Sequence, residues 1–294
     1  MSDSPTASPV ERAQILQAAG TVGVLTSGAA SRPRMLAALC DPAISTAAVA
    51  ALIEQEPAMV ARVLRVANSS YYGQPRSIRT LERALQLLGL DAVRGIAAAT
   101  CLDRGLVRGA VAALIEPRAL TLHSVASAAA AEALARERHP ELAPEAFIAS
   151  LLQNLGIALQ VQLDRAGVSA MLAARAAQDA RDLVMLEAAC TRVAHAECMA
   201  VVYESWQLPE SLVAATRYHH RPLAAPAAHQ VLAGYVYLGG VLALASGYTY
   251  SLEPAAVTPA PQVLQLLALE AAAVEAVAEG LSGRVAALIE ALLS

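Results

Sequence analysis

Four histidines are the residues of this chain best suited to chemistry: His123, His195 and the adjacent pair His219 and His220. An imidazole can transfer protons near neutral pH or bind a metal ion through a neutral nitrogen. His123, His195 and His219 together could hold Zn²⁺ without a carboxylate. A histidine on the apolar face of a helix is more often a neutral, hydrogen-bonded core residue, and we expect that role for His123 and His195. Because His219 and His220 are adjacent, we expect at most one of them to face inward.

A second feature is the amide pair Gln153 and Asn154, which lies inside the apolar stretch 145–160. The large apolar residues of this stretch recur at the spacing of one helical face, and they are Phe147, Ile148, Leu151, Leu152 and Leu155. This spacing predicts a helix buried along one side. Two amides within such a helix either line a site or lie on its solvent side, and the pattern leaves both interpretations open.

Several enzyme classes are excluded because all 21 basic residues are arginine. Without lysine the chain can form neither a Schiff base nor a phosphate-binding loop that ends in Gly-Lys-Ser/Thr, and a Ser-Lys hydrolase is excluded as well. No Gly-x-Ser-x-Gly motif is present, so a serine nucleophile is not expected.

The overall charge gives no general attraction to nucleic acid or to an anionic membrane, because the net charge is −4 and the pI is about 5.9. Residues 62–94 are an exception, with six arginines against two carboxylates. Five of these arginines are candidate phosphate or nucleic-acid contacts: Arg62, Arg65, Arg76, Arg79 and Arg83. A solvated helix face, or pairing with acidic residues elsewhere, is the more usual role of such arginines.

Composition predicts an all-α fold, because 56% of the residues are hydrophobic but only 3% are aromatic, and alanine is the best helix former. The four cysteines are widely spaced and are expected to be reduced, buried residues. Residues 1–10 lack a basic start and an apolar core, so we expect no signal peptide and a cytoplasmic protein. The apolar stretch that begins at Val231 contains several glycines and tyrosines, and we expect a buried core helix there.

The helical patterns divide the chain into four parts. We expect a disordered tail over 1–9, an N-terminal helical bundle lobe over 10–116, a second helical lobe over 117–250 and a C-terminal helical segment over 251–294. Within the first lobe, Ser45 or Thr46 and then Thr80 are expected N-caps. Gly89 is expected to end a helix, and Asn68 to close another through its amide.

Residues 52–89, "LIEQEPAMVARVLRVANSSYYGQPRSIRTLERALQLLG", closely resemble the start of HDOD domains, the HD-related output domains of bacterial signalling proteins. The second half of the chain has motifs in the same order as that family: a His-Ser helix, Leu-Leu-x-x-x-Gly, His-Ala-Glu, Trp-x-Leu-Pro and a His-His pair. The resemblance extends over roughly residues 22–250 and implies that the second lobe has an HD-domain-like fold.

The resemblance also implies a degenerate site. HD-type phosphohydrolases hold a metal with a histidine, a His-Asp doublet and a later aspartate. By position, His123 matches the first ligand, Gln153 and Asn154 replace the doublet, and Gly240 replaces the last aspartate. The remaining members of the vestigial pocket are His195, His219 and His220, which match further histidines of the HD-GYP relatives. Neutral amides are poor ligands for a divalent ion, so we expect no catalytic residue, metal or cofactor.

These observations lead to the hypothesis of a non-catalytic regulatory module that acts through protein partners of a bacterial signalling pathway. The vestigial pocket is a candidate site for a small ligand, and no membrane association is expected. The alternative is nucleic-acid or cyclic-nucleotide binding through the arginine-rich first lobe. A residual metal-dependent phosphohydrolase is the third and least favoured interpretation.

Overall fold

The computed structural model describes residues 9–25, 44–55, 57–68, 78–90, 93, 96, 113–205, 208–253 and 258–293. Within these ranges the regular elements are helices, and the pairing of Tyr250 with Glu253 is an isolated bridge. The predicted all-α class is therefore confirmed.

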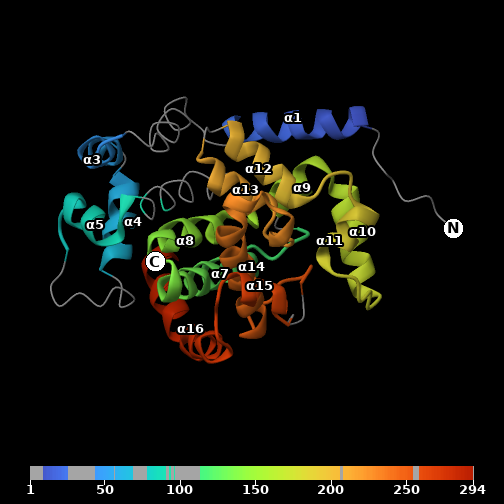
Figure 1. Ribbon diagram of the computed structural model, residues 1–294. Helices are drawn as coiled ribbons and strands as arrows, with labels where there is room; N and C mark the ends of the chain where they lie inside the picture. The colour runs from blue at the N-terminus through green and yellow to red at the C-terminus, as the bar shows by residue number, and fades with distance from the viewer. Residues whose placement is uncertain are drawn as a thin grey trace.

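The described residues before 113 form the helices α1 (Pro9–Leu25), α3 (Thr46–Glu54), α4 (Pro57–Ala67) and α5 (Leu81–Leu88). Two of the expected caps are present, since the Ser45 hydroxyl accepts a bond from the Ala48 N–H and Thr80 does the same for Arg83. Gly89 ends α5 with a φ of 80°, a conformation that favours glycine. Helices α3, α4 and α5 pack on one another as a small bundle (Figure 1).

Asn68 closes α4 as expected and also fixes the chain that returns toward α5. Its Nδ2 donates to the Leu64 carbonyl at 2.8 Å and to the Ile78 carbonyl at 2.7 Å. Its Oδ1 accepts the Ile78 N–H at 2.6 Å. One amide side chain thus satisfies a free helix carbonyl and holds the segment before α5 against the end of α4.

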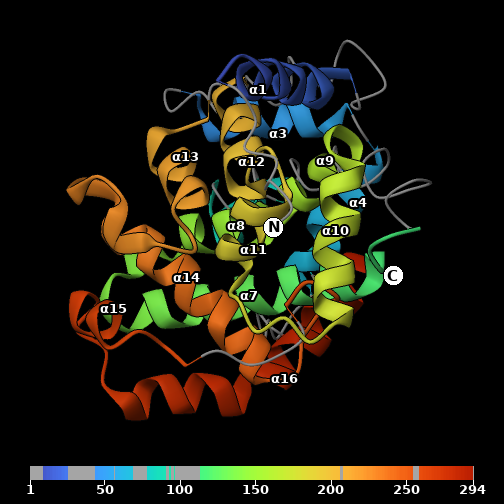
Figure 2. The ribbon, with the colours of Figure 1, turned by 90° about the vertical axis from the view of Figure 1, so that its right-hand side faces the viewer.

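The second half of the chain is a larger helical assembly. Its α-helices are α7 (Pro117–Arg138), α8 (Ala143–Leu152), α9 (Leu155–Leu163), α10 (Arg165–Ala176), α11 (Leu183–Cys190), α12 (His195–Ser205), α13 (Glu210–Arg217), α14 (Gln230–Ala245), α15 (Pro261–Leu266) and α16 (Ala271–Leu293). Short 3₁₀ helices lie at Pro140–Leu142, Pro222–Ala224 and Ala227–His229. The N-terminal helix α1 lies across α12, at the top of Figures 1 and 2.

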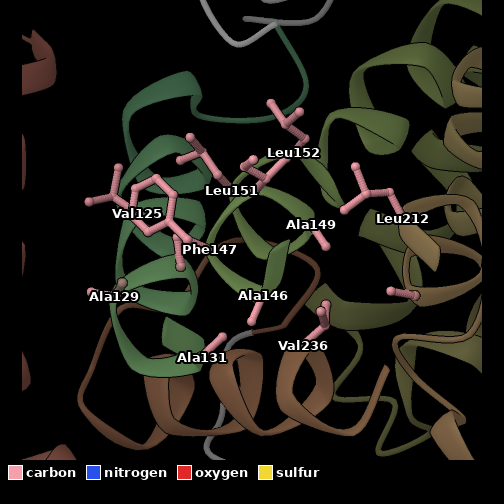
Figure 3. Packing of buried hydrophobic residues seen from close by; sticks show 14 of the residues in the cluster. Val125, Ala129, Ala131, Ala146, Phe147, Ala149, Leu151, Leu152, Leu212 and Val236 are labelled. Atoms are coloured by element: carbon pink, nitrogen blue, oxygen red, sulfur yellow. The ribbon is translucent and has the colours of Figure 1, made fainter. Parts of the chain in front are cut away.

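Helix α7 is the centre of this assembly, with α8 and α14 packed against it. Figure 3 shows Phe147 of α8 on the side of α7 that carries Val125 and Ala129. The approach of α14 depends on Gly239, because a Cβ at this position would lie only 2.4 Å from the Ser127 carbonyl oxygen. Small side chains on α7 and a glycine on α14 therefore set the distance between the two helices that carry His123 and Gly240.

The helix expected over residues 145–160 is interrupted, so this prediction was wrong in detail. Helix α8 ends at Leu152, Gln153 and Asn154 form a turn, and α9 starts at Leu155. The Ile157 N–H bonds to the Asn154 carbonyl, which tightens the chain at this point. The break reflects different packing partners, because α8 packs on α7 whereas α9 packs on α12.

Two helical stretches are long and apolar enough to cross a membrane, Glu145–Leu163 and Ala227–Ala245. They are 83% and 61% buried within the protein, so packing in the core accounts for their apolar character. The C-terminal helix α16 packs on α7 of the larger assembly and also on α4 of the small bundle.

Candidate functional site

A cavity of about 180 Å³ brings together most of the site residues expected from the sequence. It lies where α7, the turn after α8, the turn after α13 and the middle of α14 meet. The expected residues that line it are His123, Gln153, Asn154, His219, His220 and Gly240. Charged side chains also reach its wall, and these are Asp182, Arg221 and Glu253.

His123 of α7 is 1% exposed and is fixed by the loop that follows α14. Its Nδ1 lies 2.8 Å from the Tyr248 carbonyl oxygen, which can only accept, so Nδ1 carries the proton. Burial lowers the pKa of His123, although the Glu253 charge and the bond to Tyr248 oppose this effect. His123 is therefore a neutral imidazole at neutral pH.

The amide pair lies inside the protein, which excludes the solvent-side interpretation. Gln153 and Asn154 are 1% and 2% exposed. Among the described residues, Oε1 of Gln153 and Nδ2 of Asn154 have no hydrogen-bond partner. Buried polar atoms are rarely left unpaired, so the cavity offers one free acceptor and one free donor to whatever occupies it.

Gly240 faces the amide pair across the cavity. A Cβ placed on Gly240 would lie 3.9 Å from Nε2 of Gln153, and no other heavy atom of the described residues outside the local helix lies within 4 Å. A side chain at this position would thus have room and would point toward the amides. The resemblance equates Gln153, Asn154 and Gly240 with metal-binding imidazole and carboxyl groups. These three positions are neighbours in space, but their side chains are two amides and the single hydrogen of a glycine.

Three histidines meet beside this cavity. His195 begins α12, and its Nε2 lies 3.1 Å from Nε2 of His219 and 3.4 Å from Nε2 of His220. The expectation that only one of the adjacent pair faces inward was wrong. The reason is that both lie in the turn after α13 rather than within a helix, so the helical angle between neighbours does not apply.

The metal-type grouping therefore differs from the one expected. Among the described residues, the side-chain nitrogens of His195, His219 and His220 lie within 4.8 Å of one another. His123 lines the same cavity but does not belong to this group. Glu197, two residues after His195 in the chain, pairs with Arg12 of α1 and does not belong to this group.

Glu187 of α11 is a site residue that sequence reasoning missed. It is 2% exposed, and its Oε1 accepts from the backbone N–H of His195 and from His195 Nδ1, both at 2.8 Å. Gln160 of α9 donates to the same oxygen at 2.7 Å. The available signal was a single carboxylate within the apolar segment "LVMLEAAC", since an unpaired acid there would be costly.

The charges of the histidine cluster follow from these contacts. Burial alone would lower the pKa of His195, but the Glu187 carboxylate outweighs burial and raises it. Burial and the neighbouring His220 and His195 lower the pKa of His219 well below its usual value. Burial alone would raise the pKa of Glu187, whereas His195 lowers it. Glu187 and His195 thus form a buried ion pair beside a neutral His219.

The candidate phosphate-binding arginines that the structure describes do not line the cavity, since Arg62 and Arg65 lie on α4, Arg79 just before α5 and Arg83 within α5. Arg65, Arg79 and Arg83 are exposed, and Arg62 is half-buried. Arg83 donates to Gln86 Oε1 at 3.0 Å. Arg76 lies outside the described residues.

A family model for the HDOD domain matches residues 27–222, which is most of the chain. The chain belongs to the HDOD family. Three solved structures share its fold at 19–23% sequence identity. One is a candidate signal-transduction protein of Marinobacter aquaeolei VT8, with 19% identity, a TM-score of 0.73 and coverage of 98% of this chain and 66% of that chain. The second is a candidate phosphohydrolase of Shewanella amazonensis SB2B, with 21% identity, a TM-score of 0.65 and coverage of 89% of this chain and 93% of that chain. The third is an HDOD domain protein of unknown function from Geobacter sulfurreducens, with 23% identity, a TM-score of 0.66 and coverage of 90% of this chain and 92% of that chain.

This HDOD chain is also 25% identical over 198 residues to an uncharacterized protein of Treponema pallidum (strain Nichols). The matched region is 66% of this chain but only 37% of that relative. The resemblance inferred from the motifs is therefore confirmed at the level of family and fold. Similarity at this level of identity leaves activity to be argued from the site itself.

The residues of this HDOD site do not fit the metal set of HD-type phosphohydrolases. That set needs carboxylates, which offset the charge of a divalent ion and bind it through oxygen. Here the doublet position carries amides and the position beside it is Gly240, with space where the last carboxylate would be. We therefore derive no metal-activated hydrolysis from these positions.

Proposed function

We propose that this HDOD protein is a non-catalytic signal-transduction module that acts through contacts with a protein partner of a bacterial signalling pathway. The observation that carries the proposal is the junction of Gln153, Asn154 and Gly240 around one cavity. The fold has kept the place where hydrolytic groups would meet, but the groups there carry no charge. We place this activity in the cytoplasm.

A hydrolytic site must supply groups that the doublet positions of this pocket lack. A bound metal lowers the pKa of water to generate hydroxide, and a carboxylate or imidazole must hold that metal or take up the proton. Neutral amides do neither. Glu187 does not replace the lost groups, because its Oε1 is already engaged by His195 and Gln160.

The fold neighbours support a regulatory role only in part. The Marinobacter protein is named for signal transduction, whereas the Shewanella protein is named as a candidate phosphohydrolase. Identities of 19% and 21% are too low to transfer either activity. The loss of charge at the doublet favours the regulatory alternative for this chain.

The direct test is a search for turnover by the full chain with nucleotides, cyclic dinucleotides and a generic phosphodiester, in the presence of Mg²⁺, Mn²⁺, Zn²⁺ or Ni²⁺. We expect no release of phosphate or nucleotide above the buffer rate. His123→Ala is the diagnostic variant and His229→Ala its control, since His229 lies outside the cavity. Metal-dependent turnover that is lost in His123→Ala but kept in His229→Ala would overturn the proposal.

The protein-contact part of the proposal needs its own experiment. The chain is used to capture partners from an extract of its native cells, with in-cell crosslinking and mass spectrometry to locate the contact residues. We expect crosslinks from one surface of the chain to a component of a signalling system. Reproducible absence of any crosslinked protein in growing and stressed cells would contradict it.

The exposed arginines support a second candidate function, the binding of phosphate groups of a nucleic acid or cyclic nucleotide. Arg65, Arg79 and Arg83 are exposed on two helices that pack together. If they bind phosphates, affinity for labelled RNA or DNA should fall steeply between two salt concentrations. The triple variant Arg65→Ala, Arg79→Ala, Arg83→Ala should remove this binding, while Arg118→Ala with Arg138→Ala on α7 should not.

A further inference from the structure

The three-histidine cluster has the donor atoms of a metal site that is separate from the lost HD-type set. Its members are His195 at the start of α12 and His219 and His220 in the turn after α13. The Nε2 atoms lie 3.1 Å apart for His195 and His219, and 3.4 Å apart for His195 and His220. Three imidazole nitrogens thus converge on one point at the wall of the cavity.

We propose that His195, His219 and His220 bind one divalent transition-metal ion, with Zn²⁺ the best match, through their Nε2 atoms. This inference goes beyond the regulatory function proposed above and does not depend on it. Metal binding and the absence of turnover are measured separately, so either proposal can fail without the other.

The separations of the nitrogens match tetrahedral coordination. A Zn–N bond is about 2.0–2.1 Å long, so two nitrogens of a tetrahedral site lie about 3.3–3.4 Å apart. The separations of 3.1 and 3.4 Å lie close to this spacing, and the ligand nitrogens of all three histidines lie within 4.8 Å of one another. Imidazole ligands without thiolate or several carboxylates favour Zn²⁺, Ni²⁺ or Cu²⁺ over Mg²⁺ or Ca²⁺.

The second nitrogen of two of the rings is already held in the way that metal ligands require. His195 Nδ1 lies 2.8 Å from Glu187 Oε1, and His219 Nδ1 lies 2.6 Å from the Thr216 carbonyl oxygen. A carboxylate and a carbonyl can only accept, so each Nδ1 carries a proton. A metal ion that displaces the Nε2 proton of His195 to solvent would leave both rings neutral, with each Nε2 lone pair directed at the shared point. A carboxylate behind a histidine is the usual outer support of a protein-bound zinc.

The close contact of His195 and His219 supports a bound metal ion independently of the spacing of the nitrogens. Both rings present Nε2 to each other at 3.1 Å while each Nδ1 is engaged elsewhere. Two lone pairs cannot face each other at this distance without a positive charge between them. Either a proton on His195 or a metal ion supplies that charge, and Glu187 compensates it in both cases. His220, at 3.4 Å, provides the third nitrogen that a single proton does not need.

The site would keep an open coordination position. His219 and His220 line the cavity, so a metal between them can be reached from it. Glu253 lines the same cavity, and its Oε2 accepts a bond from the Tyr250 hydroxyl at 2.8 Å. Together with Glu187 it offsets the charge of a dication. The metal would tie the start of α12 to the end of α13.

The test uses the full chain purified without a polyhistidine tag. After treatment with a chelator, the protein is titrated with Zn²⁺ in a calorimeter, and the metal content of protein from untreated cells is measured by mass spectrometry. We expect one Zn²⁺ per chain and an increase in melting temperature on binding. Co²⁺ should give the visible absorption bands of a four-coordinate site.

Variants distinguish this site from surface binding. His219→Ala and His220→Ala should each abolish stoichiometric binding, and His229→Ala, a histidine outside the cluster, should leave it unchanged. Glu187→Gln keeps the shape of the supporting residue and should weaken affinity by about 10–100-fold. Circular dichroism establishes that each variant is folded, and a variant that fails this control is replaced by the Gln substitution at the same position.

Two outcomes would overturn the proposal. The first is a wild-type chain that binds no stoichiometric Zn²⁺ at neutral pH, which leaves the proton on His195 as the occupant of the cluster. The second is Zn²⁺ binding of unchanged affinity in both His219→Ala and His220→Ala, which would place the metal elsewhere on the chain.

Discussion

Oε1 of Glu187 accepts both the backbone N–H and the Nδ1 of His195, each at 2.8 Å. Because His195 is the first residue of α12, its N–H is one of the donors that the helix leaves unpaired. Glu187 thus caps α12 from a different helix and fixes the histidine ring with the same oxygen. The position of the histidine cluster therefore depends on α11, which contributes no histidine of its own.

Removing this carboxylate should be costly. Glu187→Ala leaves the His195 N–H and Nδ1 without their acceptor in a buried place, and we expect the free energy of unfolding to fall by about 3–5 kcal/mol. Urea denaturation followed by circular dichroism measures the change. Glu279→Ala, an exposed carboxylate on α16, should shift the unfolding free energy by less than about 0.5 kcal/mol. Equal changes in unfolding free energy for the two variants would show that the contact between Glu187 and His195 does not stabilise the fold.

His123 should make the protein less stable at acid pH. Burial holds its pKa below 6.5 in the folded chain, so below that pH the unfolded chain binds a proton that the folded chain does not. Stability then rises with pH between the two pKa values, by up to about 1.4 kcal/mol per pH unit. His123→Gln should give a shallower loss of unfolding free energy from pH 6.5 to pH 5.

The measurement is made with a chelator present, so that metal binding does not contribute. His219 and His220 have lowered pKa values and act in the same direction as His123, whereas His195 has a raised pKa and acts in the opposite direction. His229→Gln is the control and should keep the slope of the wild type. If His123→Gln has the wild-type slope, the buried ring is not the group that the unfolded chain protonates.

Much of the site could be predicted from the sequence because its residues lie at positions set by helix periodicity and by family motifs. His123, the amide pair and Gly240 meet at one cavity. His123 lies on α7, Gly240 on α14 and the amide pair directly after α8, so the packing of these three apolar helices brings the residues together. The family and the helical class could be predicted for the same reason.

What could not be predicted depends on contacts between segments. His220 faces inward because a turn, not a helix, follows Arg217. Glu187 reaches His195 because α11 ends two residues before the bend that leads into α12, and no periodicity encodes that geometry. The turn at the amide pair arises because α8 and α9 pack on different helices. In each case the tertiary arrangement decides between local alternatives that the sequence leaves equal.

The close approach of α9 to α12 gives a test of how the histidine cluster is positioned. A Cβ on Gly156 would lie 2.1 Å from the carbonyl oxygen of His195, which is backbone and cannot rotate away. Gly156→Ala should therefore reduce the unfolding free energy by about 1–3 kcal/mol or more. Gly283→Ala on α16 is the matched control, since a Cβ there has no heavy atom of the described residues beyond its own helix backbone within 4 Å, and it should stabilise the chain by about 0.5–1 kcal/mol. A similar sign for both substitutions would contradict this packing.

The lost HD-type set can be rebuilt in steps, which tests whether Gly240 is the missing carboxylate position. The variants are made in a His219→Ala background, so that the three-histidine cluster does not bind the added metal. Gln153→His with Asn154→Asp restores the doublet but leaves one carboxylate absent, and we expect weak Mn²⁺ binding. Adding Gly240→Asp supplies a second charge beside the doublet, where the nearest heavy atom to a Cβ is Gln153 Nε2 at 3.9 Å.

We expect the triple substitution to bind Mn²⁺ at least about tenfold more tightly than the double one, because affinity for hard cations rises with the number of charged oxygen ligands. Gly240→Asn in place of Gly240→Asp is the control, since it has the same shape without the charge. Calorimetry or Mn²⁺ electron paramagnetic resonance gives the affinities. If the double substitution binds as tightly as the triple, the final carboxylate comes from another residue of the cavity wall, for which Asp182 and Glu253 are the candidates.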